Sequence, residues 1–243
     1  MIPILEIFGC TIQGEGPNVG ARCIFVRVKG CTYACSWCDT KETWLNHSAE
    51  ATSYTDEALI NELYNLSVNT MCNRVVLTGG NPCMYDFTTV IKSLKRHIKF
   101  DVETQGDLLP DWLSLVDTIV FSPKAPSSKM PDTYDNITKY ISEKAKAHQT
   151  IAIKIPVFNK DDIEFARKYA KFVNNFMGIH DNNLKLYLSV GNTDVDTTDS
   201  IRDGVLTDYE ALLNTINIYP EDFQNVFLLP QLHTLVWGNK SGV

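Results

Sequence analysis

The chain has 243 residues, a formal net charge of -7 at pH 7, 44% hydrophobic residues and 21% charged residues. This length and composition are those of an ordinary globular protein with a substantial core, so we expect a single domain over residues 1–243. The negative charge argues against a nucleic-acid partner, and the lack of any apolar stretch of bilayer-spanning length argues against a membrane partner.

The N-terminal stretch MIPILEIFGC is apolar, but it lacks a basic leader and a small-residue cleavage site, and Glu6 interrupts it. We expect it to form the first strand and not a signal peptide. Seven cysteines in a chain without an export signal indicate a reducing, cytoplasmic location, where thiols stay available for metal. Four of them are scattered, and we expect each to be a small packing residue: Cys10, Cys23, Cys72 and Cys83.

Seven further segments have the apolar, β-branched composition of buried strands. In chain order they cover residues 22–28, 74–78, 100–104, 118–122, 151–157, 184–190 and 226–230. Helical segments alternate with them over residues 55–66, 86–98, 134–147, 161–177 and 207–217. Thr55 is a suitable N-cap for the first of these helices, and Asp161 with Glu164 resembles a capping box at the start of the fourth.

Nearly continuous apolar strands that alternate with amphipathic helices indicate a parallel sheet covered on both faces. The pattern contains roughly six such units, which is fewer than the eight of a closed (β/α)8 barrel. We therefore predict an α/β fold of the partial (β/α)6 barrel type. An open doubly wound sheet is the alternative.

Glycine and polar motifs directly follow five of the expected strands. They are TGGN at 78–81, ETQG at 103–106, SPK at 122–124, SVGN at 189–192 and PQLH at 230–233. In parallel α/β folds the carboxyl ends of the strands share one edge, and that edge carries the chemistry. We expect these motifs to form one site together with the loop that follows strand 22–28.

That loop, GCTYACSWCDT, contains Cys31, Cys35 and Cys38 in the spacing C-x3-C-x2-C. Three thiolates this close together can bind one iron–sulfur cluster, and a 4Fe–4S cluster with three protein ligands keeps one iron open. Zinc bound by the three cysteines and His47 is the alternative, since Cys3His is a common zinc ligand set. Because the cysteine spacing is only moderately specific, the neighbouring motifs must decide.

With Trp37 as its aromatic residue, the loop C-x3-C-x-aromatic-C resembles the signature of radical S-adenosylmethionine (SAM) enzymes, and TGGN resembles their glycine motif. More narrowly, a series of motifs from Met1 to Val243 is similar to the 7-carboxy-7-deazaguanine synthase family, and most similar to its subgroup with a GGNP motif. The motifs are TIQGEG (11–16), FVRVKGC (25–31), WCDT (37–40), GGNP (79–82), ETQG (103–106), SPK (122–124) and QLHTLVWGNKSGV (231–243).

The resemblance implies a lyase that converts 6-carboxy-5,6,7,8-tetrahydropterin to 7-carboxy-7-deazaguanine with loss of ammonia, in the biosynthesis of queuosine and other 7-deazapurines. It implies a 4Fe–4S cluster, SAM as a regenerated cofactor, and Mg2+. It also implies a homodimer and a flavodoxin-type reducing partner. Two alternatives stay open: another radical SAM activity such as glycyl-radical activation, and a zinc-binding module without enzymatic activity.

The resemblance also assigns residues to these cofactors. The three loop cysteines are the expected cluster ligands, and Thr40 is the expected Mg2+ ligand, together with the substrate carboxylate. Residues of the loop and of three strand ends are expected to contact SAM: Trp37, Cys38, Asp39, Gly79, Gly80, Asn81, Ser122, Pro123, Lys124 and Ser189. Asn81 stands where the wider superfamily commonly has glutamate, so we expect a weaker or water-mediated contact between its carbonyl and the SAM ammonium. Residues 189–192 depart from the Gln-Pro-x-acid motif of many relatives, and Asp39 could equally cap the turn.

For the substrate, the planar fork of Arg27 suits a carboxylate or the edge of a pterin. An arginine on a buried strand requires either an anionic ligand or a carboxylate beside it. The other expected substrate contacts are Ile12, Gln13, Gly14, Glu15, Thr78, Glu103, Gln231 and His233. For His233 a structural role is the stronger interpretation.

Overall fold

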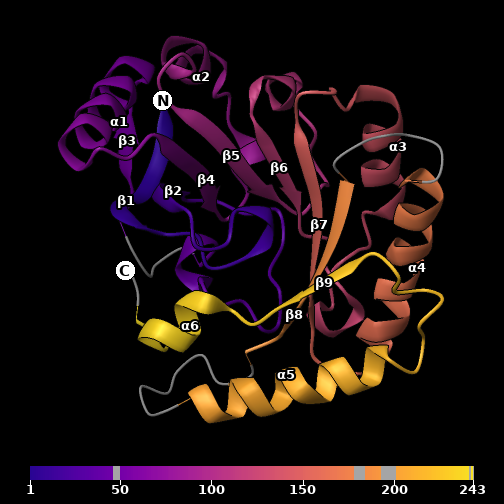
Figure 1. Ribbon diagram of the computed structural model, residues 1–243. Coiled ribbons are helices and arrows are strands. Elements are labelled where there is room, and N and C mark those ends of the chain that lie inside the picture. Colours follow the sequence, from indigo (N-terminus) through magenta and orange to yellow (C-terminus); the bar gives the residue numbers. More distant parts are fainter. Residues whose placement is uncertain (46–49, 178–183, 193–200, 241, 243) are drawn as a thin grey trace.

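The computed structural model describes residues 1–45, 50–177, 184–192, 201–240 and 242 (Figure 1). Its strands form one nine-stranded sheet in the order β3-β1-β2-β4-β5-β6-β7-β8-β9. Their bounds are β1 (Ile2–Ile12), β2 (Arg22–Val28), β3 (Thr52–Tyr54), β4 (Arg74–Gly79), β5 (Lys99–Thr104), β6 (Thr118–Phe121), β7 (Thr150–Val157), β8 (Leu184–Val190) and β9 (Val226–Leu229).

Neighbouring strands are parallel from β2 through β9, whereas β1 pairs antiparallel with both β2 and β3. Right-handed crossovers that always advance in one direction place their helices on the same face of a sheet. A doubly wound sheet instead reverses direction at a switch point. The order of the described parallel strands contains no reversal, so the fold is an open partial barrel, as predicted, and not a doubly wound sheet.

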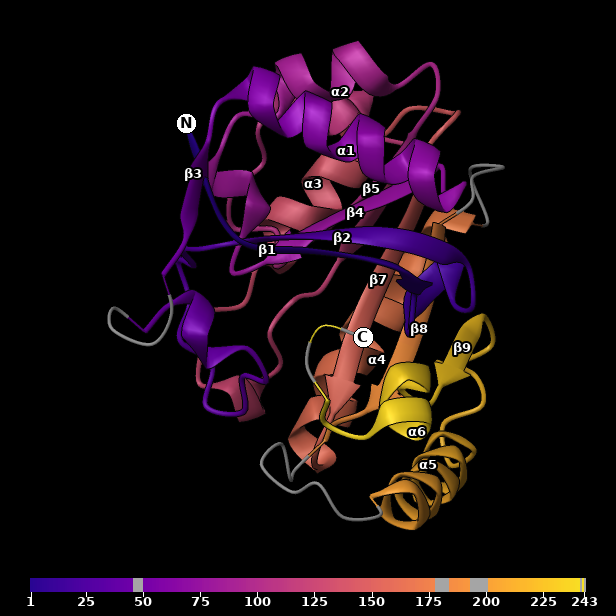
Figure 2. The same ribbon diagram turned by 90° about the vertical axis from the view of Figure 1, so that its left-hand side faces the viewer.

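Most of the helices pack along the outer side of the curved sheet, and Figure 2 shows β1 and β2 running across the direction of β7 and β8 as the twist accumulates. The helices are α1 (Asp56–Thr70), α2 (Thr88–Leu94), α3 (Tyr134–Lys144), α4 (Lys160–Met177), α5 (Arg202–Ile216) and α6 (Leu232–Trp237). Short 3-10 segments are η1 (Gly16–Asn18), η2 (Lys41–Thr43), η3 (Pro82–Met84), η4 (Asp111–Leu115) and η5 (Pro126–Ser128). In the part of the chain that the structure describes, no helix combines the length and apolar character needed to cross a bilayer.

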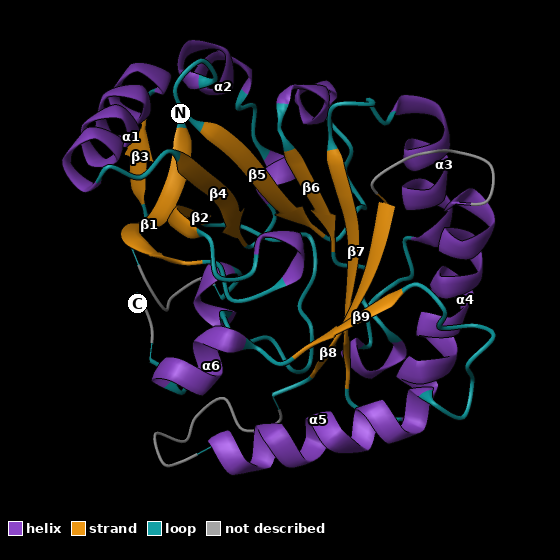
Figure 3. Cartoon of the chain, viewed as in Figure 1, coloured by secondary structure: helices purple, strands orange, loops and turns teal. Residues whose placement is uncertain are grey.

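The main apolar core lies between the sheet and the outer helices, where Tyr169, Phe87 and Phe100 are among the largest fully buried side chains. A second, much smaller apolar cluster of Val120, Ala152 and Tyr187 lies apart from it. Because side chains alternate along a strand, Lys154 faces the same side as Ala152, and this inner side becomes polar toward the carboxyl ends. Figure 3 shows loops and short helical segments gathered there, next to α6. The scattered cysteines pack as predicted: three are buried and one is half-buried against the core, namely Cys23, Cys72, Cys83 and Cys10.

The helix starts show which local signals were sufficient. Thr55 caps α1 as predicted, since its side chain accepts a hydrogen bond from the Ala58 amide. The cap predicted for α4 is wrong, because the side chain of Asn159 accepts the hydrogen bond from the Asp162 amide at 3.1 Å. Glu164 pairs with Arg167 one turn further on instead of closing a capping box.

Candidate functional site

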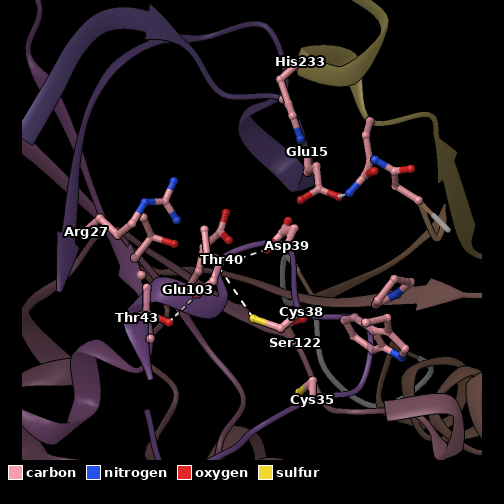
Figure 4. A pocket seen from close by; sticks show the side chains of 18 of the residues that line it. Glu15, Arg27, Cys35, Cys38, Asp39, Thr40, Thr43, Glu103, Ser122 and His233 are labelled. Carbon is pink, nitrogen blue, oxygen red and sulfur yellow. Dashed lines mark hydrogen bonds between the residues drawn. The ribbon is translucent and has the colours of Figure 1, made fainter. Parts of the chain in front are cut away.

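A cavity with a volume of about 340 Å³ lies at the carboxyl ends of the parallel strands, and Figure 4 shows side chains converging on it from both ends of the chain. Most of the predicted site residues line it. They are Ile12, Gln13, Gly14, Glu15, Arg27, Cys31, Cys35, Trp37, Cys38, Asp39, Thr40, Thr78, Gly79, Gly80, Glu103, Ser122, Lys124, Gln231 and His233. Asn81, Pro123 and Ser189 do not line it, so the structure brings together one site but not every predicted member.

The cysteine loop leaves β2 and folds over the ends of β4 and β5. Cys35 is buried, and Cys31 and Cys38 are half-buried. Burial raises the pKa of the Cys31 thiol, and it raises that of Cys35 to about 11 against the opposing effect of the Lys124 ammonium. Such thiols are poor free nucleophiles, whereas binding to iron deprotonates a thiol outright. Together with Cys38 on the same short loop, these two cysteines face the cavity and fit the ligand set of an iron–sulfur cluster.

The zinc alternative fits this geometry less well. The described residues contain no group of three His, Cys, Asp or Glu side chains placed to hold one metal ion. Zinc ligands must converge on a single point, whereas each cysteine of a cluster binds a different iron. His47, the fourth ligand of the zinc alternative, lies outside the described residues.

The two glycines at the end of β4 hold the cysteine loop. The Asn81 amide donates to the Gly30 carbonyl oxygen at 2.8 Å, directly before the first cluster cysteine. A Cβ atom at Gly80 would lie 1.8 Å from that same oxygen, so a side chain at residue 80 would displace the loop. Gly79 has φ of +121°, a conformation that favours glycine. The structure shows a close backbone approach of these glycines to the strand and loop that carry Cys31, whereas their predicted approach to SAM stays a prediction.

The Asn81 prediction needs correction. The side chain is fully buried, and its Oδ1 atom accepts hydrogen bonds from the Cys83 amide and from Thr104 Oγ1, both at 3.1 Å. Its Nδ2 atom donates to Asp107 Oδ1 at 2.8 Å. The carbonyl that we expected to contact the SAM ammonium is therefore occupied by two protein donors. Ser189 is also buried beside β9, and no hydrogen-bond partner for its hydroxyl is found within the described ranges.

One wall of the cavity combines an aromatic stack with a positive charge. Trp37 stacks on Phe158 with ring centroids 4.8 Å apart, and its Nε1 atom donates to Ser127 Oγ at 2.9 Å. The Lys124 ammonium lies 5.6 Å from the Trp37 ring centroid and donates to Ser122 Oγ at 3.2 Å. Trp37, Ser122 and Lys124 therefore lie together, as the resemblance implied. Phe158 was not predicted, because only the fold brings it beside Trp37.

A second group of charges in the cavity lining centres on Lys154 of β7, which was not predicted from the sequence. Its Nζ atom lies 2.7 Å from Glu15 Oε2 and 3.2 Å from Glu103 Oε2. The remaining carboxylate oxygens accept from Gln231 at 3.2 Å and from Gln13 at 3.0 Å. The available signal was a lysine inside an apolar strand, because a buried ammonium requires anionic partners.

Lys154 also determines the protonation of its neighbour. Burial alone would raise the pKa of Glu15, but the charges of Lys154 and His233, with hydrogen bonds from Lys154 and Gln231, lower it to about 2. The pKa of Lys154 is raised in turn, because the two adjacent carboxylates outweigh the effect of burial. Glu15 and Lys154 are therefore both ionised at neutral pH.

Arg27 enters the cavity from β2 with a carboxylate already beside it. Its Nε atom lies 2.6 Å from Oε1 of Glu6, which the register of β1 and β2 places directly opposite. The acidic partner that a structural role requires is thus present. In Figure 4 the guanidinium group nevertheless points into the open space, so its terminal nitrogens face a prospective ligand.

Thr40 and the C-terminal segment line the remaining edges of the cavity. Thr40 Oγ1 donates to Asp39 Oδ1 at 3.0 Å and lies 3.9 Å from Cys38 Sγ, so the exposed aspartate orients the hydroxyl beside the cluster loop. His233 packs on Gly14, where a Cβ atom would meet its Nδ1 atom at 2.1 Å. Residues 241 and 243 of the last motif lie outside the described residues.

Three cysteines on the loop after the first parallel strand, at the open end of a partial barrel, define a radical SAM enzyme with a 4Fe–4S cluster. In agreement, the family model described as a 4Fe-4S single cluster domain matches residues 12–109. The chain belongs to the 7-carboxy-7-deazaguanine synthase family. It is 40% identical over 250 residues to the 7-carboxy-7-deazaguanine synthase of Bacillus subtilis (strain 168), covering 100% of this chain and 98% of that relative.

Other relatives agree. Identity to the 7-carboxy-7-deazaguanine synthase of Bacillus cereus is 35% over 249 residues, covering 100% of this chain and 99% of the relative. The crystal structure of QueE from Escherichia coli has 22% identity and a TM-score of 0.67, covering 96% of this chain and 94% of that one. At this identity the structural likeness shows a shared fold, and it agrees with the partial barrel.

Proposed function

We propose that the protein converts 6-carboxy-5,6,7,8-tetrahydropterin to 7-carboxy-7-deazaguanine with loss of ammonia, as a lyase of queuosine and other 7-deazapurine biosynthesis. The observation that carries the proposal is full-length similarity to relatives of that name. When bound, the cluster and SAM would supply the radical chemistry that this reaction requires. The polar cavity next to the cysteine loop supports this assignment, since it offers space for a small polar heterocycle.

The cofactor side of the cavity is the wall of Trp37, Ser122 and Lys124. Cys31 and its two partner cysteines would hold the cluster, and Lys124 would bind the SAM carboxylate as a point charge. Trp37, held by its stack and its Nε1 hydrogen bond, provides a rigid apolar face for an adenine ring. These residues bind and orient the cofactor and exclude water from it.

The substrate side is the group of charged residues that includes Arg27 and Lys154. Arg27 is placed to bind a carboxylate, with its Nε atom held by Glu6. Glu15 and Glu103 present carboxylate oxygens in the cavity, and Lys154 compensates their charge. Such acceptors suit the amino and ring N–H donors of a pterin.

The proposal also includes a Mg2+ ion, the location and oligomeric state of the protein, and its electron donor. Thr40 would contribute one oxygen to Mg2+, with the other ligands coming from substrate and water, because hard cations bind oxygen ligands. Such an ion would polarise and orient the substrate carboxylate. We place the protein in the cytoplasm as a homodimer that receives electrons from a flavodoxin-type protein.

The test is anaerobic incubation of the reconstituted protein with SAM, reductant, Mg2+ and the carboxytetrahydropterin. We expect 7-carboxy-7-deazaguanine in the wild type and none in Cys35→Ala. Cys10→Ala is the matched control, because Cys10 lies outside the cavity lining, and it should keep activity. Intact cluster and SAM binding without a deazaguanine product would overturn the specific reaction.

A further inference from the structure

Gln105 follows β5 and takes no part in the chemistry proposed above. Its side chain is buried, with 3% of the residue exposed. Its Nε2 atom lies 3.7 Å from Cys31 Sγ and 2.8 Å from Thr32 Oγ1, so the two N–H groups of one amide reach a cluster-ligand sulfur and the neighbouring hydroxyl. Cys31 Sγ also accepts a hydrogen bond from the Tyr33 amide at 3.4 Å.

A chain of hydrogen bonds holds this amide in place. Thr32 Oγ1 donates to Asp107 Oδ2, and Asp107 Oδ1 accepts from Asn81 Nδ2 at 2.8 Å. The backbone carbonyl of Gln105 accepts from Thr133 Oγ1 at 2.6 Å. The asparagine of the GGNP motif therefore belongs to the network that supports the first cluster cysteine.

The position of the donor has an electronic consequence. Reduction adds negative charge to a cluster and its sulfurs, so a hydrogen bond to a ligand sulfur stabilises the reduced form more than the oxidised form. The bond is also stronger in a buried setting of low dielectric than it would be in water.

We propose that Gln105 is a positioning residue that raises the reduction potential of the cluster through its hydrogen bond to the Cys31 sulfur. The proposal goes beyond the pterin reaction and depends only on the presence of the cluster. It assigns the Thr32, Asp107 and Asn81 side chains the task of keeping the Gln105 amide aimed at that sulfur.

The test is a redox titration of the reconstituted holoprotein, monitored by electron paramagnetic resonance, without SAM or substrate. Gln105→Met keeps a side chain of similar length and volume but removes the two N–H donors of the amide. We expect the ratio of reduced to oxidised cluster at a fixed potential to fall about tenfold, which corresponds to a shift of 59 mV to more negative potential for a one-electron couple. Gln149→Met is the matched control, because Gln149 is another buried glutamine whose Nε2 atom donates to Leu113 and Val116 carbonyls at 2.8 and 2.9 Å.

Gln105→Leu is a second variant with the same expected direction. An unchanged midpoint potential in either variant with full iron content would overturn the proposal. Loss of the cluster from both variants, with Gln149→Met intact, would overturn it too, because Gln105 would then be required to hold the loop. Because no pterin is present, failure of the proposed reaction would not alter this result.

Discussion

At the scale of single residues, Lys154 balances the charge of two acidic side chains of the cavity. It is an ammonium on a buried strand that compensates two carboxylates, Glu15 and Glu103, at 2.7 and 3.2 Å. Without it, two negative charges would face each other in a setting of low dielectric, which disfavours their ionised forms. The lysine therefore maintains the charge of the cavity as well as its shape.

Lys154→Met should lower the free energy of unfolding at pH 7 by about 3–5 kcal/mol, because it leaves buried carboxylates unpaired. In the wild type, Glu15 has a folded pKa of about 2 against an ordinary value of 4.5, so it contributes stability that is lost only as pH falls below 4.5. In the variant, burial no longer opposed by the Lys154 charge raises the pKa of Glu15 above its unfolded value, so the stability of the folded state falls as pH rises. Urea unfolding should therefore show the variant regaining stability from pH 7 to 5.5, while Glu15 contributes no such change in the wild type.

Lys171→Met is the control for this prediction. The exposed Lys171 lies 3.7 Å from the half-buried Asp222, which Arg167 already pairs at 2.6 Å, so this contact contributes at most about 1 kcal/mol. A Lys154→Met protein with unchanged stability at pH 7, or with stability that rises with pH between 5.5 and 7, would contradict the electrostatic role.

At the scale of elements, the carboxyl end of β4 and the cysteine loop depend on each other. The Gly79–Gly80 backbone passes so close to Val28 and Gly30 that neither glycine can carry a Cβ atom without displacing the backbone beside it. A helix cap, in contrast, needs only residues within one turn, as Thr55 shows by accepting a hydrogen bond from the Ala58 amide. Contacts between elements therefore carry the positioning of the cluster, while the helices are specified locally.

Gly80→Ala should lower the iron content per chain after anaerobic reconstitution to well below half of the wild-type value. The added Cβ atom would lie 1.8 Å from the Gly30 carbonyl oxygen and would displace the loop that carries Cys31. Gly204→Ala in α5 is the control, since nothing lies within 4 Å of its added Cβ atom. It should leave iron content unchanged and raise the free energy of unfolding by about 0.5–1 kcal/mol. Full iron incorporation by Gly80→Ala would show that the loop tolerates the displacement.

At the scale of the whole molecule, the cavity is closed by the two ends of the sequence. The Leu232 amide donates to the Gly14 carbonyl oxygen at 3.0 Å, and Gln231 donates to Glu15 at 3.2 Å. Figures 1 and 2 show α6 lying beside the N-terminal loop, far from it in sequence. The cysteine loop instead contacts β4 and η5, since Ser36 donates to the Ser127 carbonyl oxygen at 2.7 Å.

Truncation after Pro230 should therefore separate binding of the cluster from positioning of the substrate. We expect iron content close to that of the wild type and a fall in product formation of about 100-fold or more, because the substrate would be poorly positioned. Iron analysis and product quantification on the same preparation check both parts. A truncated protein that turns over normally, or one that loses its cluster, would contradict this division.

Much of this architecture could be predicted because its signals are local. The spacing of three cysteines, the polar motifs after the strands and the Thr55 cap each depend on residues close in sequence. The α4 cap failed because several acidic and amide side chains compete within a few residues, and Asn159 has the required position. Lys154 was missed, and the protein partners of Asn81 were not predicted, because Glu15, Glu103 and Asp107 are far from these residues in sequence.

By itself, the sequence determined the strand and helix pattern, the cysteine loop and the family, because periodicity and motif spacing are properties of adjacent residues. Only the tertiary structure decided that Lys154 joins Glu15 to Glu103, that Glu6 accompanies Arg27, and that Asn81 supports the cluster loop through Asp107. Each of these contacts joins residues that the chain separates and the sheet brings together. Their strength depends on burial, and burial exists only after the partial barrel has formed.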